Sequence, residues 1–197
     1  MSSDAVAAVT DTPRNRRQEE TFRKVLTAGI DMLRESSYGD LTVRAVAARA
    51  GVAPATAYTY FSSKNHLIAE VYLDLVRQVP FFTDVNDSMT TRVDKVVRAL
   101  TLVVADEPEV AAACTTALLG GGSDAAVRTV RDRIGAEIHR RIRSAVGPEA
   151  DARIVSALEM TFFGALVNAG SGAFTYHQIA DRLTYVVGLI LGEDRDK

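Results

Sequence analysis

The stretch PATAYTYFSSK, residues 54–64, concentrates hydroxyl groups and contains a single charged residue. Threonine and tyrosine hydroxyls can donate hydrogen bonds to phosphate oxygens, and a threonine methyl can contact the methyl group of thymine. A solvated helix face would normally carry Glu, Lys or Gln at these positions instead. The residue types therefore favour a surface that meets the phosphate backbone and base edges of a nucleic acid.

Lys64 adds a cation next to a predicted helix N-terminus. Ser62 or Ser63 is expected to cap a helix over about 63–79, because serine oxygens accept hydrogen bonds from the free N–H groups of a first turn. A lysine in that turn opposes the helix dipole at a cost of roughly 0.3–1 kcal/mol. An anion at this helix end would remove the conflict, and a DNA phosphate is the hypothesis that the sequence favours.

Two short helices and a tight turn are predicted to position these groups. The segment TVRAVAARAGVAPATAYTYF begins with Thr42, a suitable N-cap, and places Gly51 where a positive φ is wanted. A second short helix over 54–61 directs Ala57 and Phe61, four residues apart, inward. Helices joined so tightly cross at a steep angle, which is the helix–turn–helix arrangement, and its second helix enters the DNA major groove.

The charge distribution supports a nucleic-acid partner for one part of the chain only. The 197 residues have a formal net charge of −2. Residues 14–64 carry nine Lys and Arg against five Asp and Glu, whereas residues 81–197 carry thirteen against sixteen. The sequence therefore predicts a basic N-terminal unit attached to a mildly acidic body.

Helical periodicity runs through the whole chain, and we predict an all-α fold of about nine helices. The predicted organisation is a disordered leader over 1–14, a three-helix, helix–turn–helix DNA-binding domain over 15–66, and a helical ligand-binding and dimerisation domain over 67–197. The longer helices are expected over about 15–35, 63–79, 149–169 and 176–191.

Several other classes of protein are disfavoured. No apolar run approaches the ~18 residues that span a bilayer, and the N-terminus lacks the order of a signal peptide, so we expect a cytoplasmic protein with no membrane partner. The lone Cys114 excludes an intrachain disulfide and is expected to be a small buried hydrophobe. His66, His139 and His177 are far apart and lack ligand neighbours, so we expect no metal, no cofactor and no catalysis.

Residues 16–80 resemble the DNA-binding domain of TetR family transcriptional regulators. The resemblance rests on residues at the family's spacing: Thr42, Ala50-Gly51-Val52, Tyr58-Thr59-Tyr60-Phe61, Ser63-Lys64 and Leu67. It implies phosphate contacts from Thr42, Tyr58, Tyr60 and Lys64, and positions at or near base edges for Arg44, Thr56 and Thr59. The helical remainder fits the family's ligand-binding and dimerisation domain in architecture alone.

Three alanines depart from the family pattern. Ala53 stands where the family usually has a Ser or Thr cap, a loss of about 1 kcal/mol. Ala55 replaces a frequent glycine, and its methyl would affect how closely the backbone approaches DNA. Ala57 replaces a larger apolar residue, so the core behind the helix must be filled otherwise.

Arg14, Arg16 and Arg17 precede the first predicted helix. Basic arms of this kind reach into a DNA minor groove. A disordered charged leader with no DNA contact is the alternative.

The predicted helix over 149–169 is apolar on more than one face, which indicates burial on two sides. One side would face its own domain, and the other a second copy, packed with the last helix as a four-helix bundle. In TetR-like proteins the last two long helices usually form the dimer interface. The interface candidates are Gly164, Asn168 and Val187, and a twofold dimer suits two DNA half-sites.

The effector pocket is expected among the fifth to eighth helices. Its candidate lining is aliphatic and aromatic, which favours an apolar or amphipathic effector such as an acyl, steroid or aromatic compound: Leu100, Val104, Leu118, Ile134, Ile138, Phe162 and Phe163. Ordinary core packing is the alternative for each of them. The arginines between residues 128 and 143 could meet an acidic ligand group, and a solvated face is the alternative there.

The sequence thus predicts a ligand-responsive repressor that binds a palindromic operator as a homodimer and is released by a small molecule. The fourth helix is the expected lever, because it begins at Lys64 and ends in the ligand domain. A small-molecule-binding or enzymatic helical protein whose N-terminal helices have no DNA role is the competing hypothesis.

Overall fold

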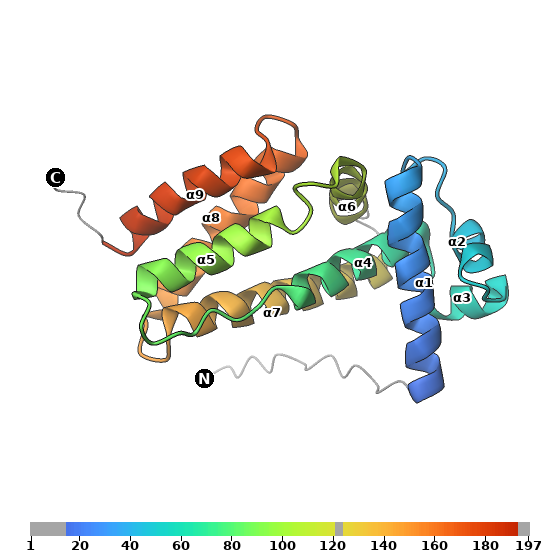
Figure 1. Cartoon of the computed structure of the whole chain (residues 1–197), viewed down its shortest axis with the longest axis horizontal. Coiled ribbons are helices and arrows are strands. Elements are labelled where there is room, and N and C mark those ends of the chain that lie inside the picture. The colour runs from blue at the N-terminus through green and yellow to red at the C-terminus, as the bar shows by residue number, and fades with distance from the viewer. Residues whose placement is uncertain (1–14, 121–123, 193–197) are drawn as a thin grey trace, which may run out of the picture.

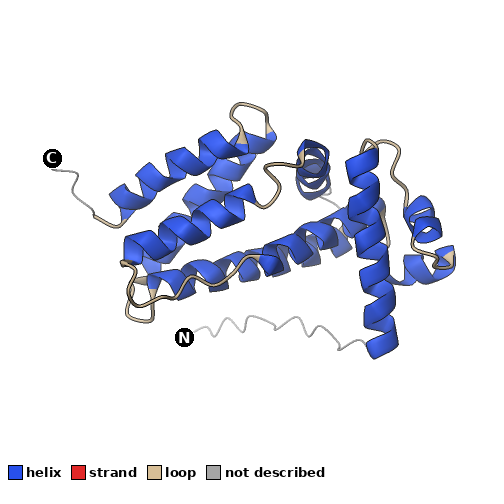
Figure 2. Ribbon diagram, viewed as in Figure 1, coloured by secondary structure: helices blue, strands red, loops and turns tan. Residues whose placement is uncertain are grey.

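The computed structural model describes residues 15–120 and 124–192. Across those ranges the chain forms helices and no strands (Figure 2), which confirms the all-α prediction. The nine helices are α1 (Arg16–Glu35), α2 (Val43–Arg49), α3 (Pro54–Tyr60), α4 (Lys64–Gln78), α5 (Met89–Leu102), α6 (Pro108–Gly120), α7 (Ala125–Val146), α8 (Ala152–Gly170) and α9 (Tyr176–Ile190).

Helices α1, α2 and α3 lie together at one end of the molecule (Figure 1). The signals predicted from the sequence define α2 and α3. The Thr42 hydroxyl accepts a hydrogen bond from the Ala45 N–H at 3.1 Å and caps α2. Gly51 has φ 65° in the turn, and α3 begins at Pro54 without a side-chain cap from Ala53. These local signals define the ends of α2 and α3, which pack against each other.

An aromatic pair anchors α3 to α1. Phe61 directly follows α3, is fully buried, and stacks on Phe22 of α1 with ring centroids 5.0 Å apart. Ala57 is fully buried on the same inward side. The stacked rings hold the end of α3 against α1, and each buried phenyl group contributes about 1.5–3 kcal/mol.

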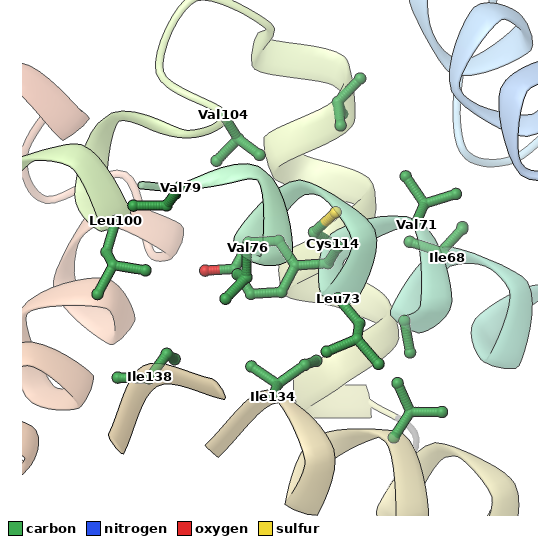
Figure 3. Packing of buried hydrophobic residues seen from close by; sticks show 14 of the residues in the cluster. Ile68, Val71, Leu73, Val76, Val79, Leu100, Val104, Cys114, Ile134 and Ile138 are labelled. Carbon is green, nitrogen blue, oxygen red and sulfur yellow. The ribbon is translucent and has the colours of Figure 1, made fainter. Parts of the chain in front are cut away.

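Helix α4 joins the N-terminal unit to the body. It contacts α1 on one side and α6 and α7 on the other, and it extends from the small helices into the rest of the fold (Figure 1). Figure 3 shows its side chains Leu73 and Val76 in the same core as Ile134 and Ile138 of α7. The core is therefore continuous across the two predicted domains.

Polar groups also bind α4 to α7. The Glu70 carboxylate on α4 is buried and accepts a hydrogen bond from Arg133 at 2.6 Å. The buried Arg141 guanidinium donates to the carbonyl oxygens of Arg77 at 2.8 Å and Val79 at 2.9 Å. Arg141 thereby satisfies carbonyl groups at the C-terminal end of α4, which have no partners within the helix.

Helix α8 is long and apolar enough to cross a membrane, even though it contains Arg153 and Glu159. Only 22% of its apolar window is buried inside the protein. The sequence predicted no membrane span, because Arg153 and Glu159 interrupt the apolar run of this helix. Because α8 packs on α9 and α7 inside a helical body, its exposed apolar face calls for another explanation.

Candidate nucleic-acid interface and effector site

The outward face of α3 carries hydroxyl groups and no charge. Thr56, Tyr58 and Thr59 are exposed, Tyr58 by 51%, and Ala55 lies exposed beside them. Arg44 is exposed on the neighbouring α2 and has no ion pair within the described part of the chain. The arrangement can present hydroxyl donors and one cation to a polyanion.

Two side chains on α3 are more constrained than the sequence predicted. Tyr60 is half-buried, with its ring edge-on to Phe22 at 6.2 Å. The Thr59 hydroxyl donates to the Ala55 carbonyl oxygen at 3.1 Å. Thr59 therefore keeps its methyl group and its acceptor lone pairs for an outside partner, but not its proton.

Lys64 has partners inside the chain. Its amine donates to the Tyr38 carbonyl oxygen at 3.1 Å and lies 4.0 Å from the centroid of the Tyr38 ring. The Tyr38 hydroxyl in turn donates to Asn65. A bound anion is therefore not needed to explain a lysine in the first turn of α4.

Asp124 supplies a negative charge near the start of α4. Ser63 caps α4 by accepting from the His66 N–H at 3.1 Å, and its hydroxyl donates to the Asp124 carboxylate at 2.8 Å. This hydrogen bond lowers the pKa of Asp124 below its ordinary value. Asp124 is itself the N-cap of α7, so one carboxylate joins the N-termini of α4 and α7. The chain itself therefore supplies a negative charge near Lys64, where a DNA phosphate was the predicted anion.

Arg16 and Arg17, which were predicted to lie in an extended arm before the first helix, are helical. Both residues lie in the first turn of α1, and Arg16 pairs with Glu20 at 3.2 Å. Asn15 is the N-cap, so α1 begins within the series Arg14, Arg16 and Arg17 and not after it. Arg14 lies outside the described residues.

The surplus positive charge of the N-terminal unit is concentrated on a few residues. Arg49 is neutralised by Glu35, with both nitrogen–oxygen distances at 2.5 Å. Exposed Arg17, Lys24 and Arg44, by contrast, have no carboxylate partner among the residues that the structure describes. The cations available to a phosphate backbone are thus fewer than the sequence count suggests.

A cavity of about 200 Å³ lies in the body, bordered by α4, α6, α7, α8 and the first turn of α9. Five of the seven predicted residues line it: Val104, Leu118, Ile134, Ile138 and Phe163. The predictions for Leu100 and Phe162 are wrong, because both side chains are fully buried in the core and do not border the cavity.

Polar residues also border the cavity. Burial raises the pKa of Tyr72, and that of the Cys114 thiol to about 12, so both stay neutral. Burial also raises the pKa of Tyr176, although a hydrogen bond with Thr115 opposes this effect. Arg131 is the one charged residue in the described lining. The sequence identified Arg131 only as one of several arginines on the seventh helix that could meet an acidic ligand group.

Apolar side chains gather on the outer faces of α8 and α9. Met160 is 74% exposed, and Val167 and Leu189 are more than half exposed. The predicted interface residues Gly164 and Asn168 lie on the exposed side of α8. Val187, the third residue predicted for the interface, is 1% exposed and packs inside its own core.

Comparisons of the sequence identify relatives over nearly its whole length. A family model described as bacterial regulatory proteins, tetR family, matches residues 25–71. The uncharacterized HTH-type transcriptional regulator Rv0767c of Mycobacterium tuberculosis is 76% identical over 178 residues, which cover 90% of this chain and 84% of that protein. The HTH-type transcriptional repressor KstR of Rhodococcus jostii is 27% identical, in an alignment that covers 97% of this chain and 93% of that protein.

Solved structures share the fold. A TetR transcriptional regulator from Rhodococcus sp. RHA1 superposes with a TM-score of 0.73 and 23% identity, over 89% of this chain and 97% of that chain. Thermus thermophilus FadR, a TetR family transcriptional repressor in complex with lauroyl-CoA, gives a TM-score of 0.63 and 13% identity, over 84% and 92%. The arrangement of a helix–turn–helix unit on a helical body is thus common to these proteins.

Proposed function

The chain belongs to the TetR family of transcriptional regulators, and we propose that it is a ligand-responsive repressor, acting in the cytoplasm as a homodimer on a palindromic operator. TetR-family regulators are DNA-binding proteins rather than enzymes. The observation that carries the proposal is the charge-free hydroxyl face of α3 beside the unpaired Arg44. The 27% identical relative named as a repressor supports the sign of regulation.

In the proposed complex α3 enters the major groove. Thr56 and Thr59 lie nearest the base edges, and the methyl of Thr59 suits a thymine because its hydroxyl proton is engaged within the helix. Arg44 reaches the groove from α2. Phosphate contacts come from Thr42, Tyr58, Tyr60 and Lys64, and Ala55 sets how closely the helix backbone approaches the DNA.

A second copy of the chain covers the apolar face of α8 and α9. Monomeric soluble proteins rarely leave several large apolar side chains exposed side by side. Met160, Val167 and Leu189 supply apolar area, and Gly164 permits close approach of the helices. A twofold dimer through this face presents two copies of α3, as a palindromic operator requires.

Release of the operator follows from movement of α4 against α7. Helix α4 begins at Lys64 in the proposed DNA interface and borders the cavity with Tyr72. Helix α7 borders the same cavity and is joined to the start of α4 through the Ser63–Asp124 hydrogen bond. A ligand that favours another packing of these helices would change the spacing of the two α3 helices.

The proposed effector is apolar or amphipathic. The cavity is lined mainly by aliphatic and aromatic side chains, among them Leu118, Ile134 and Phe163. FadR, which shares the fold, is described in complex with lauroyl-CoA, an acyl compound. That likeness supports an acyl or similar ligand here.

The test is a titration of fluorescently labelled DNA from upstream of the protein's own gene. Lys64→Ala should weaken binding to all sequences alike and reduce the dependence of affinity on salt, whereas Thr59→Ala should change which sequence is preferred. Lys95→Ala, on α5, is the control for loss of a positive charge outside the interface. If Lys64→Ala and Lys95→Ala had the same effect, the phosphate assignment would be wrong.

A further inference from the structure

Arg131 presents unpaired donors at an apolar cavity. Its Nε and Nη2 atoms are excluded from solvent and have no hydrogen-bond partner within the described structure. None of the residues described in the cavity lining is acidic. Buried polar groups in folded proteins are almost always hydrogen-bonded, and two unpaired, solvent-excluded nitrogens of a charged group are a costly exception. The exception points to a partner that the chain does not itself supply.

The unpaired atoms form one edge of the guanidinium group. The Nε–H and one Nη2–H point the same way and match the two oxygens of a carboxylate. Arg34 uses this edge elsewhere in the chain, donating from Nε and Nη2 to the two oxygens of Glu107 at 2.5 and 2.8 Å. Arg131 borders the cavity, and the same pair of donors is left without a partner there.

Neighbouring arginines of α7 show why Arg131 differs from them. Arg133 donates to Glu70, and Arg141 donates to Glu137 and to backbone carbonyls of α4. Those arginines serve the packing of α4 against α7. Arg131 faces the cavity instead and has no such structural partner.

We propose that the cavity binds an aliphatic carboxylic acid, whose carboxylate pairs with the Nε–Nη2 edge of Arg131. This inference rests on the proposed function and narrows its effector to one chemical class. A carboxylate carries the single negative charge that one arginine balances, whereas a phosphate monoester would bring a larger charge into an apolar site. Two oxygens on one carbon also fit the two donors.

The rest of the lining receives the hydrocarbon chain. Aliphatic side chains from α6, α7 and α8 surround the cavity, including Leu118, Ile134 and Leu166. Its volume of about 200 Å³ lies below the roughly 300–1,000 Å³ of most ligand pockets, which favours a slim aliphatic chain over a bulky ring system.

The test uses isothermal titration calorimetry on the full chain without DNA. The probes are octanoate, decanoate and dodecanoate, with 1-octanol and 1-decanol as uncharged partners of matched length. We expect at least one acid to bind wild-type protein at least about tenfold more tightly than its alcohol, a difference of about 1.4 kcal/mol. Arg131→Met should remove this preference, and Arg131→Lys should retain only part of it. Arg128→Met, an equal loss of charge one turn earlier on α7, should retain it.

Thermal unfolding without ligand separates a binding role from a structural one. Because Arg131 has no partner to lose, Arg131→Met should leave the melting temperature equal or higher. The inference is overturned if no acid is preferred over its alcohol, or if Arg131→Met still prefers the acid. A lowered melting temperature in both Arg131 variants would also overturn it, by showing a structural role. Operator binding is measured separately, so loss of the acid preference with intact DNA binding would leave the proposed function standing.

Discussion

Removing the hydrogen bond between Ser63 and Asp124 tests whether the start of α4 is energetically coupled to the start of α7. The bond joins the proposed DNA-binding unit to the helix that borders the effector cavity. Ser63→Ala, Asp124→Asn and the double variant complete a double-mutant cycle. The asparagine keeps an oxygen that can cap α7, so this variant chiefly removes the charge.

The expected magnitudes follow from the contacts. Ser63→Ala removes the side-chain cap of α4, which should cost about 1 kcal/mol. It also removes the hydrogen bond to the Asp124 carboxylate, and because this bond is partly exposed its loss should cost near the lower end of ~1.5–3 kcal/mol. Asp124→Asn should cost about 1 kcal/mol, because the cap of α7 survives in weakened form. The coupling free energy between the two sites should be about 1 kcal/mol.

Urea unfolding at one fixed protein concentration gives the four free energies, since the stability of a dimer depends on concentration. The pKa of Asp124 is lowered by folding, so its contribution is complete above its unfolded pKa of about 3.9 and is lost as pH falls through the folded pKa. The coupling should therefore be full at pH 7 and decline below about pH 4. Additive effects within about 0.3–0.5 kcal/mol at pH 7 would refute the reasoning.

Three further predictions concern other contacts. Met160→Asp should convert the dimer to a monomer in light scattering, because it buries a charge in the α8–α9 face; an unchanged dimer would remove this face from the interface. Glu70→Gln should lower stability at pH 7 by about 3 kcal/mol, because it removes the negative charge from the buried Glu70–Arg133 ion pair. Burial opposes ionisation of Glu70, but His66, 3.8 Å away, and the hydrogen-bonded Arg133 lower the pKa of its carboxyl below the ordinary value. The variant should therefore also lose part of the acid sensitivity below about pH 4; an unchanged pH profile would contradict this. Phe61→Ala should cost about 3–5 kcal/mol in urea and abolish DNA binding, whereas Phe61→Leu should cost less than about 1.5 kcal/mol; equal costs would argue against an aromatic anchor.

Local chemistry made the helix–turn–helix unit predictable. The N-cap at Thr42, the positive φ of Gly51 and the inward spacing of Ala57 and Phe61 each depend on residues within a few positions. Such short-range signals survive in any packing of the chain. The ring that stacks on Phe61 was not predictable, because Phe22 comes from another helix.

Long-range partners limited the prediction of the site. Lys64 meets Tyr38, and Ser63 meets Asp124 sixty-one positions away, which no local pattern reveals. The burial of Val187 was not predictable for a different reason. Helix α9 is apolar on its exposed side as well as its inner side, so periodicity could not decide which residues meet a second copy.

The cavity lining shows the same limit. Apolar side chains at helical spacing serve core and cavity alike, so Leu100 and Phe162 could not be separated from Ile134 and Phe163 by sequence alone. Arg131 was one of several arginines on α7. Only the packing shows that Arg133 and Arg141 have structural partners while two Arg131 nitrogens have none.

Footprinting of the DNA upstream of the gene tests the central claim most directly. The account predicts a protected region made of two half-sites related by twofold symmetry, each read by one α3 helix, with protection that weakens as salt rises. It also predicts that Phe61→Ala abolishes the footprint. Uniform or absent protection by a folded wild-type dimer at low salt would contradict the claim that this protein is a sequence-specific regulator.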